Sequence, residues 1–479
     1  MWVLWLILIG LAAVIAVVIY NTSRFVPLPD TKSTPAPIAP VDQEMAAQKL
    51  AAMIRCKTVS SRDKSQEDPA EFEKFKTVLS ELFPLVHQRA TVKELEPRGL
   101  LYHVPGESKD HPVVFMSHFD VVAATQDAWQ KPAFDGVIED GVLWGRGTLD
   151  TKVTLLGVMQ SAETLFEQGF TPKNDLYFSF AGDEEIAGES APAIVDELER
   201  MGVVPALVLD EGGAVVEGVF PGVDEPCALV GIAEKGMLDL EFFAQGAGGH
   251  ASAPPPHTLV GELAQACVHV ENRPFPARLT RASSEMFDTL GRRSTYVYRM
   301  IFSNLWLFKP VLDMICRKRG GEMNALMRTT VAFTCMQGSK GTNVLPPEAS
   351  MTANLRLISG ETVDSAVKRI RHIIKNDKIQ LRVIHGMNPS PESSTESDGW
   401  IKLKRAIEDT WPDAVVSPYL MVACSDSRHF CRISGNVLRF SAMALTKEER
   451  GMIHGNDERI PVEKIARVVE FYIRLMSQC

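Results

Sequence analysis

The chain has 479 residues, of which 45% are hydrophobic and 23% charged, an ordinary globular composition with enough length for more than one domain. A formal net charge of -10 argues against a nucleic-acid partner, because proteins that bind nucleic acid usually carry a basic face. The eight cysteines contain no C-x-x-C pair and form no dense framework, so neither a zinc ribbon nor a small disulfide scaffold is indicated, and the redox compartment stays open.

The chain begins with an uninterrupted apolar segment, Trp2–Tyr20, with aromatic residues near both ends. At about 1.5 Å per residue it reaches roughly 28 Å, close to the thickness of a bilayer core. We predict an uncleaved, single-pass transmembrane anchor over residues 1–22. A cleaved signal peptide is the alternative, although the basic n-region and an A-x-A site are missing. Arg24 and Lys32 give a faint positive-inside signal, which would place the following chain in the cytoplasm.

Residues 23–41 are rich in proline and lack a clear period, which predicts an extended tether. Helical periodicities and short apolar runs then alternate along the chain. Predicted helices cover residues 42–55, 69–83, 154–166 and 191–201, and predicted strands cover residues 100–104, 113–116, 175–180 and 206–209. This alternation predicts an α/β fold with a largely parallel sheet flanked by helices on both faces. We assign residues 42–234 and 387–479 to this catalytic domain.

The pattern changes after residue 233. Predicted strands cover residues 238–244, 330–336, 349–357 and 379–384, and predicted helices cover residues 258–270 and 363–374. The order strand, helix, strand, strand, helix, strand predicts an inserted α+β, ferredoxin-like lid domain over residues 235–386. We expect it to open and close about connections near Glu234 and Gly386, and it is a candidate surface for a homodimer.

A helical insertion, residues 273–328, interrupts the predicted lid and contains the apolar run Ile301–Cys316. Lys309, Pro310 and Asp313 break this run, so it should not span a membrane. One interpretation is a helical elaboration packed on its own domain. The other is a surface for a lipid chain, a partner subunit or the bilayer, and the sequence leaves both open.

His118 and Asp120 follow the predicted strand 113–116, at the end of the strand where α/β sheets place their ligands. Residues two apart in an extended chain point the same way. A neutral imidazole can bind a divalent metal through one nitrogen while a carboxylate fixes the ring through the other. A single His-x-Asp triplet is weak evidence, so further ligands are needed.

Other acids and a second histidine follow buried strands or glycine-rich turns, and each alone has an ordinary explanation as a cap or turn residue. They are Asp150, Glu184, Glu185, Asp210 with Glu211 beside it, and His454. Two zinc ions about 3.5 to 4 Å apart require a bridging carboxylate, further ligands and an open position for water. A carboxylate that is not a ligand must take the proton of the water. Adjacent Glu184 and Glu185 diverge, so one ligand and one base is the natural division.

The segments SHFDV, GRGTLDTK, GDEE, LDEGG, GGHAS, GTNVLP and IHGNDERI resemble, in this order, the aminoacylase/carboxypeptidase family of di-zinc metallohydrolases. The resemblance extends from residue 42 to the end and is greatest to the branch of carboxypeptidase S and the N-fatty-acyl-amino-acid synthase/hydrolases. It implies two Zn²⁺ per chain. One would be held by His118, Asp150 and Asp210, and the other by Asp150, Glu185 and His454. It also implies that Asp120 orients His118 and that Glu184 is the general base and later the general acid.

The resemblance further implies that His250, in GGHAS, reaches an active site, in dimeric members that of the partner, to stabilise the oxyanion. Asn343, Arg356 and Arg428 would bind the backbone and carboxylate of the substrate. For the two arginines a surface ion pair is an equal alternative. Two departures from the family pattern, Cys424 before the SDSR loop and Val153 after DTK, concern the substrate pocket.

We therefore expect a membrane-anchored, zinc-dependent hydrolase of the amide bond in N-acyl amino acids with a free carboxylate. The branch resemblance extends this to N-fatty-acyl substrates and to a reversible reaction, and it favours a catalytic domain on the non-cytoplasmic side. A carboxypeptidase or dipeptidase acting on short peptides is the alternative within enzymes. A metal-free, membrane-anchored binding protein is the alternative outside them, and it would require loss of the ligands.

Overall fold

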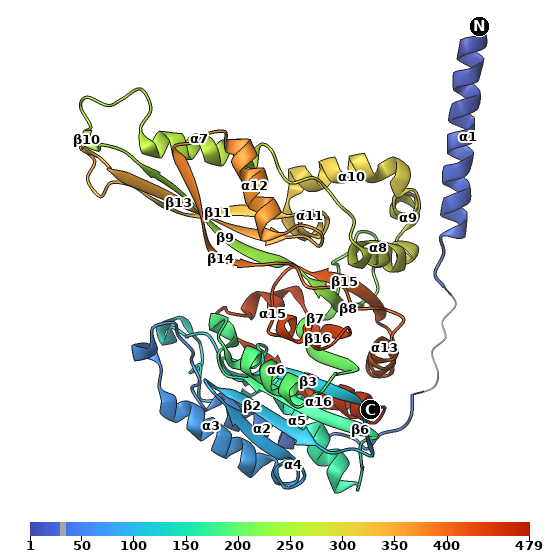
Figure 1. The fold of residues 1–479 in the computed structure, drawn as a ribbon. Helices are drawn as coiled ribbons and strands as arrows, with labels where there is room; N and C mark the ends of the chain where they lie inside the picture. The colour runs from blue at the N-terminus through green and yellow to red at the C-terminus, as the bar shows by residue number, and fades with distance from the viewer. Residues whose placement is uncertain (29–34) are drawn as a thin grey trace.

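The computed structural model describes residues 1–28 and 35–479, so residues 29–34 of the predicted tether, including Pro29 and Lys32, lie outside the described residues. Figure 1 shows a lower body built on one sheet, an upper lid with its own sheet, and a long N-terminal helix standing at one side. That helix, α1 (Trp2–Arg24), is the one described helix that is long and apolar enough to cross a membrane. Such a helix is consistent with an anchor or a signal peptide.

The body is built on an eight-stranded sheet with the order β1-β2-β6-β3-β7-β16-β8-β15. The strands are β1 (Thr91–Leu95), β2 (Gly99–Val104), β3 (Ser108–His118), β6 (Asn174–Ala181), β7 (Leu207–Val216), β8 (Cys227–Glu234), β15 (Val415–Met421) and β16 (Val437–Leu445). The central pairs β6–β3, β3–β7 and β7–β16 are parallel, while β1 and β2 join antiparallel at one edge. The predicted, largely parallel sheet is therefore a mixed one with a parallel centre.

Helices cover both faces of this sheet, as predicted. One face carries α2 (Gln43–Ile54), α3 (Pro69–Leu82), α4 (Pro84–Arg89), α5 (Lys152–Glu167), α13 (Asp398–Thr410) and α16 (Val462–Met476), and the other carries α6 (Ser190–Arg200) and the short α14 (Ser427–Phe430). Along β3, Phe115 packs into the core on the α5 and α16 side of the sheet, and Val114 and Met116 pack into the core on the α6 side, because successive residues of a strand face opposite ways. Apolar side chains on both faces explain why the sequence of this strand shows no alternation.

The lid has the predicted order of elements, and its four strands form an antiparallel sheet with the order β11-β13-β9-β14. The elements are β9 (Gly236–Gln245), α7 (Leu259–Glu271), β11 (Thr330–Gln337), β13 (Glu348–Leu357), α12 (Val363–Ile374) and β14 (Ile379–Met387). Buried residues alternate along β13, because α7 and α12 cover one face of the sheet. A further two-stranded sheet, β10 (Gly249–His250) with β12 (Val344–Leu345), forms the tip of the lid.

The insertion forms the helices α8 (Arg281–Arg293), α9 (Tyr296–Phe302), α10 (Leu305–Arg319) and α11 (Gly321–Met327). The sequence predicts it as part of the lid, but the buried side chains of these four helices belong to the core of the body, and Phe275, which precedes them, packs in the lid. The rings of Phe287 and Phe302 lie 5.8 and 4.7 Å from that of Phe220, which precedes the lid in the chain. The insertion is thus a helical elaboration, and it packs on the body.

A small three-stranded sheet, β17 (Arg459–Pro461), β5 (Val142–Trp144) and β4 (Val137–Glu139), joins distant parts of the chain. Its antiparallel pairing sets Arg459 opposite Trp144. The glycine-rich turn that follows β5 therefore lies beside the loop that precedes β17, and these two segments carry Asp150 and His454.

Candidate active site

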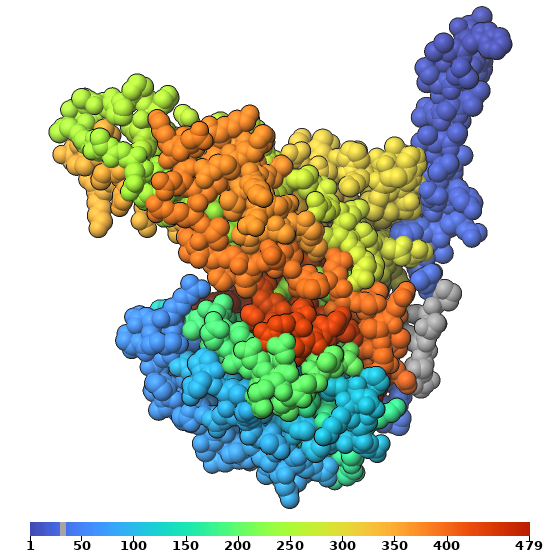
Figure 2. All heavy atoms as spheres, in the orientation of Figure 1, coloured from blue at the N-terminus to red at the C-terminus, as the bar shows by residue number. Residues whose placement is uncertain are grey.

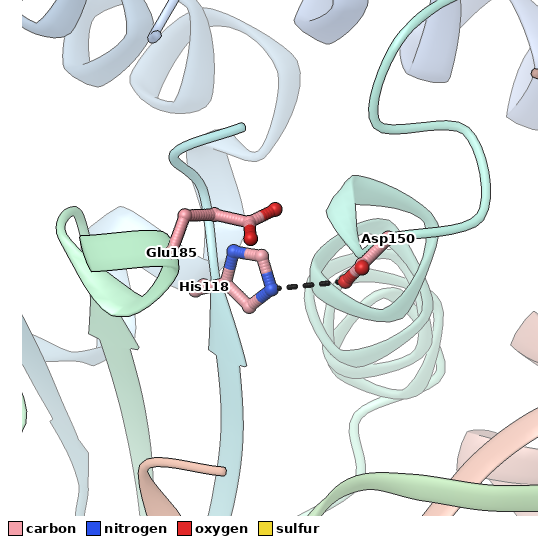
Figure 3. A group of neighbouring side chains, drawn as sticks. All are labelled: His118, Asp150 and Glu185. Atoms are coloured by element: carbon pink, nitrogen blue, oxygen red, sulfur yellow. Dashed lines mark hydrogen bonds and ion pairs between the residues drawn. The ribbon is translucent and has the colours of Figure 1, made fainter. Parts of the chain in front are cut away.

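Asp150 lies between two histidines, one at each carboxylate oxygen. His118, buried at the end of β3, places Nε2 3.1 Å from Asp150 Oδ1 (Figure 3). His454 places Nε2 2.9 Å from Asp150 Oδ2 and 3.1 Å from Glu185 Oε2. A carboxylate shared in this way has the arrangement required of a ligand that bridges two metal ions.

Glu458 fixes the turn that carries Asp150. Its carboxylate is fully buried and pairs with Arg146 Nη1 at 2.6 Å. The backbone N–H groups of Gly147, Leu149 and Asp150 donate to Glu458 Oε1 at 3.1, 2.7 and 3.2 Å. Because Glu458 and His454 share one loop, this buried carboxylate holds both segments of the cluster together. Sequence reasoning missed Glu458, although it stands in the segment IHGNDERI.

Asp120 supports two parts of the site. His118 Nδ1 lies 3.0 Å from the Asp120 carbonyl and 3.4 Å from its carboxylate. A proton on Nδ1 would leave Nε2, which faces Asp150, free to bind a metal. The same carboxylate accepts hydrogen bonds from the backbone N–H groups of Glu184 and Glu185, both at 3.1 Å, and from Ser60 Oγ at 2.6 Å. Asp120 therefore positions the glutamate turn as well as the histidine.

The structure brings Glu211, rather than Asp210, next to His118. Glu211 Oε1 lies 3.6 Å from His118 Nε2, whereas Asp210 Oδ2 accepts a hydrogen bond of 3.0 Å from the Ser427 N–H. The prediction that the strand ends at Leu209 is wrong, because β7 continues to Val216. Pairing with β3 stops at Leu209, and β7 then follows β16 with an irregular register.

Several carboxylates are crowded into this buried space. Burial, with nearby Asp426 and Glu211, raises the pKa of Glu184 well above its usual range. Burial and the Asp150 charge raise the pKa of Glu211 to about 7. Glu185 Oε1 is buried and has no hydrogen-bond partner among the residues that the structure describes. Two groups, one of His118, Asp150 and Glu185 and one of His118, Glu184 and Glu211, each place their ligand atoms within 4.8 Å. Such a mixture of imidazole and carboxylate donors fits divalent zinc.

The structure does not bring His250 or Asn343 into this cluster. Both are exposed at the lid tip, where the Ala251 N–H donates to the Asn343 carbonyl at 3.0 Å. Ser252 Oγ lies 2.8 Å from His250 Nδ1. Figure 1 places β10 at the far end of the lid from the sheet of the body. Any contact of His250 with an active site therefore requires a different position of the lid relative to the body, or the active site of a second chain.

The two predicted substrate arginines lie at the base of the lid. Arg428 forms an ion pair of 2.7 Å with the fully buried Glu234. The ion pair of Arg428 is therefore buried, and the alternative of a surface ion pair does not hold for this arginine. Arg356 Nη1 donates to Cys424 Sγ at 3.1 Å. Sequence reasoning missed Lys235, whose ammonium donates to the Arg328 carbonyl at 2.8 Å and whose pKa burial lowers to about 7.

The mixed α/β body, the antiparallel lid and the Asp150 carboxylate shared by two histidines are together typical of metallohydrolases with a lid domain. The chain belongs to Peptidase family M20/M25/M40, whose profile matches residues 114–478. This membership confirms the family resemblance and the prediction of a metallohydrolase. A member from Bacillus subtilis, the YXEP protein, is a dinuclear metal-binding peptidase, 11% identical with a TM-score of 0.55 over 91% of this chain and 98% of that one.

Relatives at higher identity cover nearly the whole chain. The N-fatty-acyl-amino acid synthase/hydrolase PM20D1 of Xenopus tropicalis is 34% identical over 98% of this chain and 93% of its own length. Probable carboxypeptidase S-like 2 of Dictyostelium discoideum is 34% identical over 90% of this chain and 84% of its own. The metallo-carboxypeptidase Sso-CP2 of Sulfolobus solfataricus has a TM-score of 0.65 at 14% identity over 90% and 98%, which supports the fold.

Proposed function

We propose that this protein hydrolyses the amide bond of N-acyl amino acids that carry a free carboxylate. The observation that carries the proposal is the Asp150 carboxylate shared between His118 and His454, with Glu184 in the same cluster. The Xenopus relative, named for N-fatty-acyl amino acids, supports a long acyl chain and a reaction that also runs toward synthesis. We propose a catalytic domain over residues 42–234 and 387–479 and a lid over residues 235–386, from which the helices of the insertion, packed on the body, are now excluded.

We propose that the cluster holds two zinc ions. His118, Asp150 and Glu211 would hold one, and Asp150, Glu185 and His454 would hold the other. When bound, zinc supplies Lewis-acid activation of water and of the amide carbonyl. Glu211 replaces Asp210 in this assignment because Glu211 Oε1 lies 3.6 Å from His118 Nε2, whereas one oxygen of Asp210 accepts the Ser427 N–H.

The zinc content of two variants tests whether Glu211 or Asp210 is the ligand. We expect Glu211→Gln to lower the content from two zinc ions per chain to one, because it removes a charged ligand. Asp210→Asn keeps one oxygen for the Ser427 N–H and should retain both ions. Elemental analysis of both purified variants makes the comparison. Loss of zinc in Asp210→Asn alone would reverse the assignment.

Glu184 is the proposed general base. It takes a proton from the attacking water at a carboxylate oxygen and returns it to the nitrogen of the departing amine. Its raised pKa suits a group that must accept and then release a proton. Asp120 holds the Glu184 N–H, which fixes the turn from which this side chain projects.

Exchange of Glu184 for Gln tests the mechanism. We expect Glu184→Gln to keep two zinc ions per chain and to lose about 10²- to 10⁴-fold in kcat, the usual contribution of a general base. The matched variant Glu185→Gln changes the adjacent side chain and should lose zinc. Elemental analysis and turnover of an N-acyl amino acid separate the two. Near-normal turnover in Glu184→Gln would refute the role.

A carboxypeptidase or dipeptidase acting on short peptides is the second candidate, favoured by the Dictyostelium relative. The values of kcat/KM for N-oleoyl amino acids, N-acetyl amino acids and dipeptides decide between them. We expect the N-oleoyl substrates to be preferred, and a preference for dipeptides would select the alternative. The metal-free binding protein is not proposed, since every predicted ligand type is present in the cluster.

Three further assignments are proposals. Exposure of His250 at the lid tip supports its delivery to an active site by lid movement or by a second chain, with Asn343 beside it. Arg356, half-buried at the base of the lid, is proposed to bind the substrate carboxylate, and Arg428 to support that region through Glu234. We also propose that α1 anchors the enzyme in a membrane with the catalytic domain on the non-cytoplasmic side.

A further inference from the structure

The last turns of α1 are held against the insertion by a polar cluster. Asn304, fully buried between α9 and α10, donates from Nδ2 to the Val18 carbonyl at 3.3 Å and accepts from Asn21 Nδ2 at 2.9 Å. Thr22 Oγ1 lies 3.2 Å from Ser303 Oγ. Figure 2 shows α1, in blue, against the insertion, in yellow. The helix α1 therefore has a defined position relative to α9 and α10.

This contact fixes the depth of α9 and α10 relative to the apolar part of α1. The apolar segment Trp2–Tyr20 ends between Val18 and Thr22. At about 1.5 Å per residue, both lie within about 3 Å of Tyr20 along the helix axis. If a bilayer surrounds the apolar segment, its surface is near Tyr20. The junction of α9 and α10 then lies at that surface.

The helices α9 and α10 carry large apolar side chains that the described part of the chain leaves more than a third exposed. Leu307, Val311 and Ile315 recur at four-residue spacing along α10, Trp306 and Met314 flank that row, and three residues at the start of α9 are exposed as well. These side chains are Trp306, Leu307, Val311, Met314 and Ile315 on α10, exposed by 60, 38, 48, 51 and 40%, and Tyr296, Val297 and Tyr298 on α9, exposed by 56, 61 and 42%. We call them the apolar face of the insertion. Tryptophan and tyrosine are the residues that favour a membrane interface.

The charge of the same helices is opposite to that of the whole chain. Residues 296–327 contain five basic and two acidic side chains, a net charge of +3, in a chain of net charge -10. The basic residues Arg317, Lys318 and Arg319 are exposed at the end of α10, and Asp313 is paired with Arg328. Basic side chains beside an apolar helix face suit a surface of anionic lipid headgroups.

We propose that the apolar face of the insertion lies in the surface of the bilayer that α1 spans. The enzyme would then be held by a spanning helix and by an interfacial helix, and the body would keep one orientation toward the lipid. Figure 1 shows α10 running across the direction of α1, as an interfacial helix does. The inference rests on retention of α1, and cleavage would strip Asn304 of its partners Val18 and Asn21. It does not depend on which amide the enzyme cleaves.

Photolabelling by lipid tests the proposal on the full chain. The protein is reconstituted in nanodiscs of phosphatidylcholine and phosphatidylserine in which some acyl chains carry a diazirine, and the labelled peptides are identified by mass spectrometry. We expect adducts within residues 296–315 as well as in α1. Met201 and Val204, exposed by 42 and 69% in the body, serve as the control surface and should carry none. Detection of the peptide Trp2–Arg24 checks that α1 is retained.

A pair of variants makes the test specific. Trp306→Glu with Met314→Glu places charges on the apolar face and should lower labelling of residues 296–315 about tenfold or more, since a charge at the interface opposes insertion. Val204→Glu is the matched control and should leave it unchanged. Labelling confined to α1 would overturn the proposal, as would absence of α1 from the purified chain. Cross-links between two copies at α10, in place of lipid adducts, would assign the face to a dimer instead.

Discussion

Replacement of Asp120 by Asn keeps the size of a side chain that supports both His118 and the glutamate turn. In the native protein one carboxylate oxygen accepts the Glu184 N–H, and the other accepts the Glu185 N–H and the Ser60 hydroxyl. Asn has one carbonyl oxygen, so in either orientation its amide nitrogen faces one backbone N–H, and that donor loses its acceptor. A hydrogen bond to a charged group contributes about 1.5 to 3 kcal/mol, which corresponds to about 10- to 100-fold in an equilibrium or rate constant.

We therefore expect Asp120→Asn to weaken zinc affinity or to lower kcat by about 10- to 100-fold, the range typical of residues that orient metal ligands. Competition with a chromogenic chelator measures the affinity, and hydrolysis of an N-acyl amino acid measures kcat. Ser60→Ala removes the hydroxyl that donates to Asp120 and leaves both backbone donors in place, so its effect should be smaller. Asp110→Asn, exposed on the same strand, is the control. Affinity and kcat both within about twofold of the native values would refute the supporting role.

Two further predictions concern the same cluster. Arg146→Met removes the ion-pair partner of the fully buried Glu458 carboxylate and should lower the free energy of unfolding by about 3 to 5 kcal/mol. The double variant Arg146→Met with Glu458→Gln should recover part of the lost stability, and urea unfolding measures both. An equal loss of stability in the single and the double variant would contradict the unpaired Glu458 charge as the cause. In the metal-free protein, hydrogen bonds to Asp150 and then to Glu185 raise the pKa of His454 to about 10. Since this folded pKa lies above the usual 6.5, the stabilisation is complete below pH 6.5 and is lost as the pH rises through about 10. Zinc binds the neutral imidazole, so zinc uptake at pH 7.5 should release a proton from His454, which an indicator dye detects. Above pH 10 the ring is already neutral, and proton release that persisted unchanged there would show that the proton does not come from His454.

Local patterns in the sequence predicted the elements of the fold better than their mutual placement. Helix α12 has the predicted bounds, residues 363–374, because its apolar face recurs at helical spacing and Thr362 caps its start. The insertion, residues 273–328, was assigned to the lid because it interrupts the lid in the chain. Its position is set instead by contacts such as those of Phe220 with Phe287 and Phe302. A long insertion packs wherever its apolar side chains find a partner, and chain order does not record that choice.

The choice between Asp210 and Glu211 shows the same limit at the site. Both acids follow an apolar run, and a strand that ended at Leu209 would leave either one free to reach a metal. The decision depends on β7 continuing past Leu209, since residues that alternate along a strand point to opposite faces. Asp210 is thereby directed to the Ser427 N–H of the neighbouring loop, and Glu211 to His118. That loop lies 217 residues further along the chain, so its N–H is a partner that no local pattern reveals. The proposed assignment of a ligand among adjacent acids therefore depends on the register of the strand, which is a property of the folded sheet.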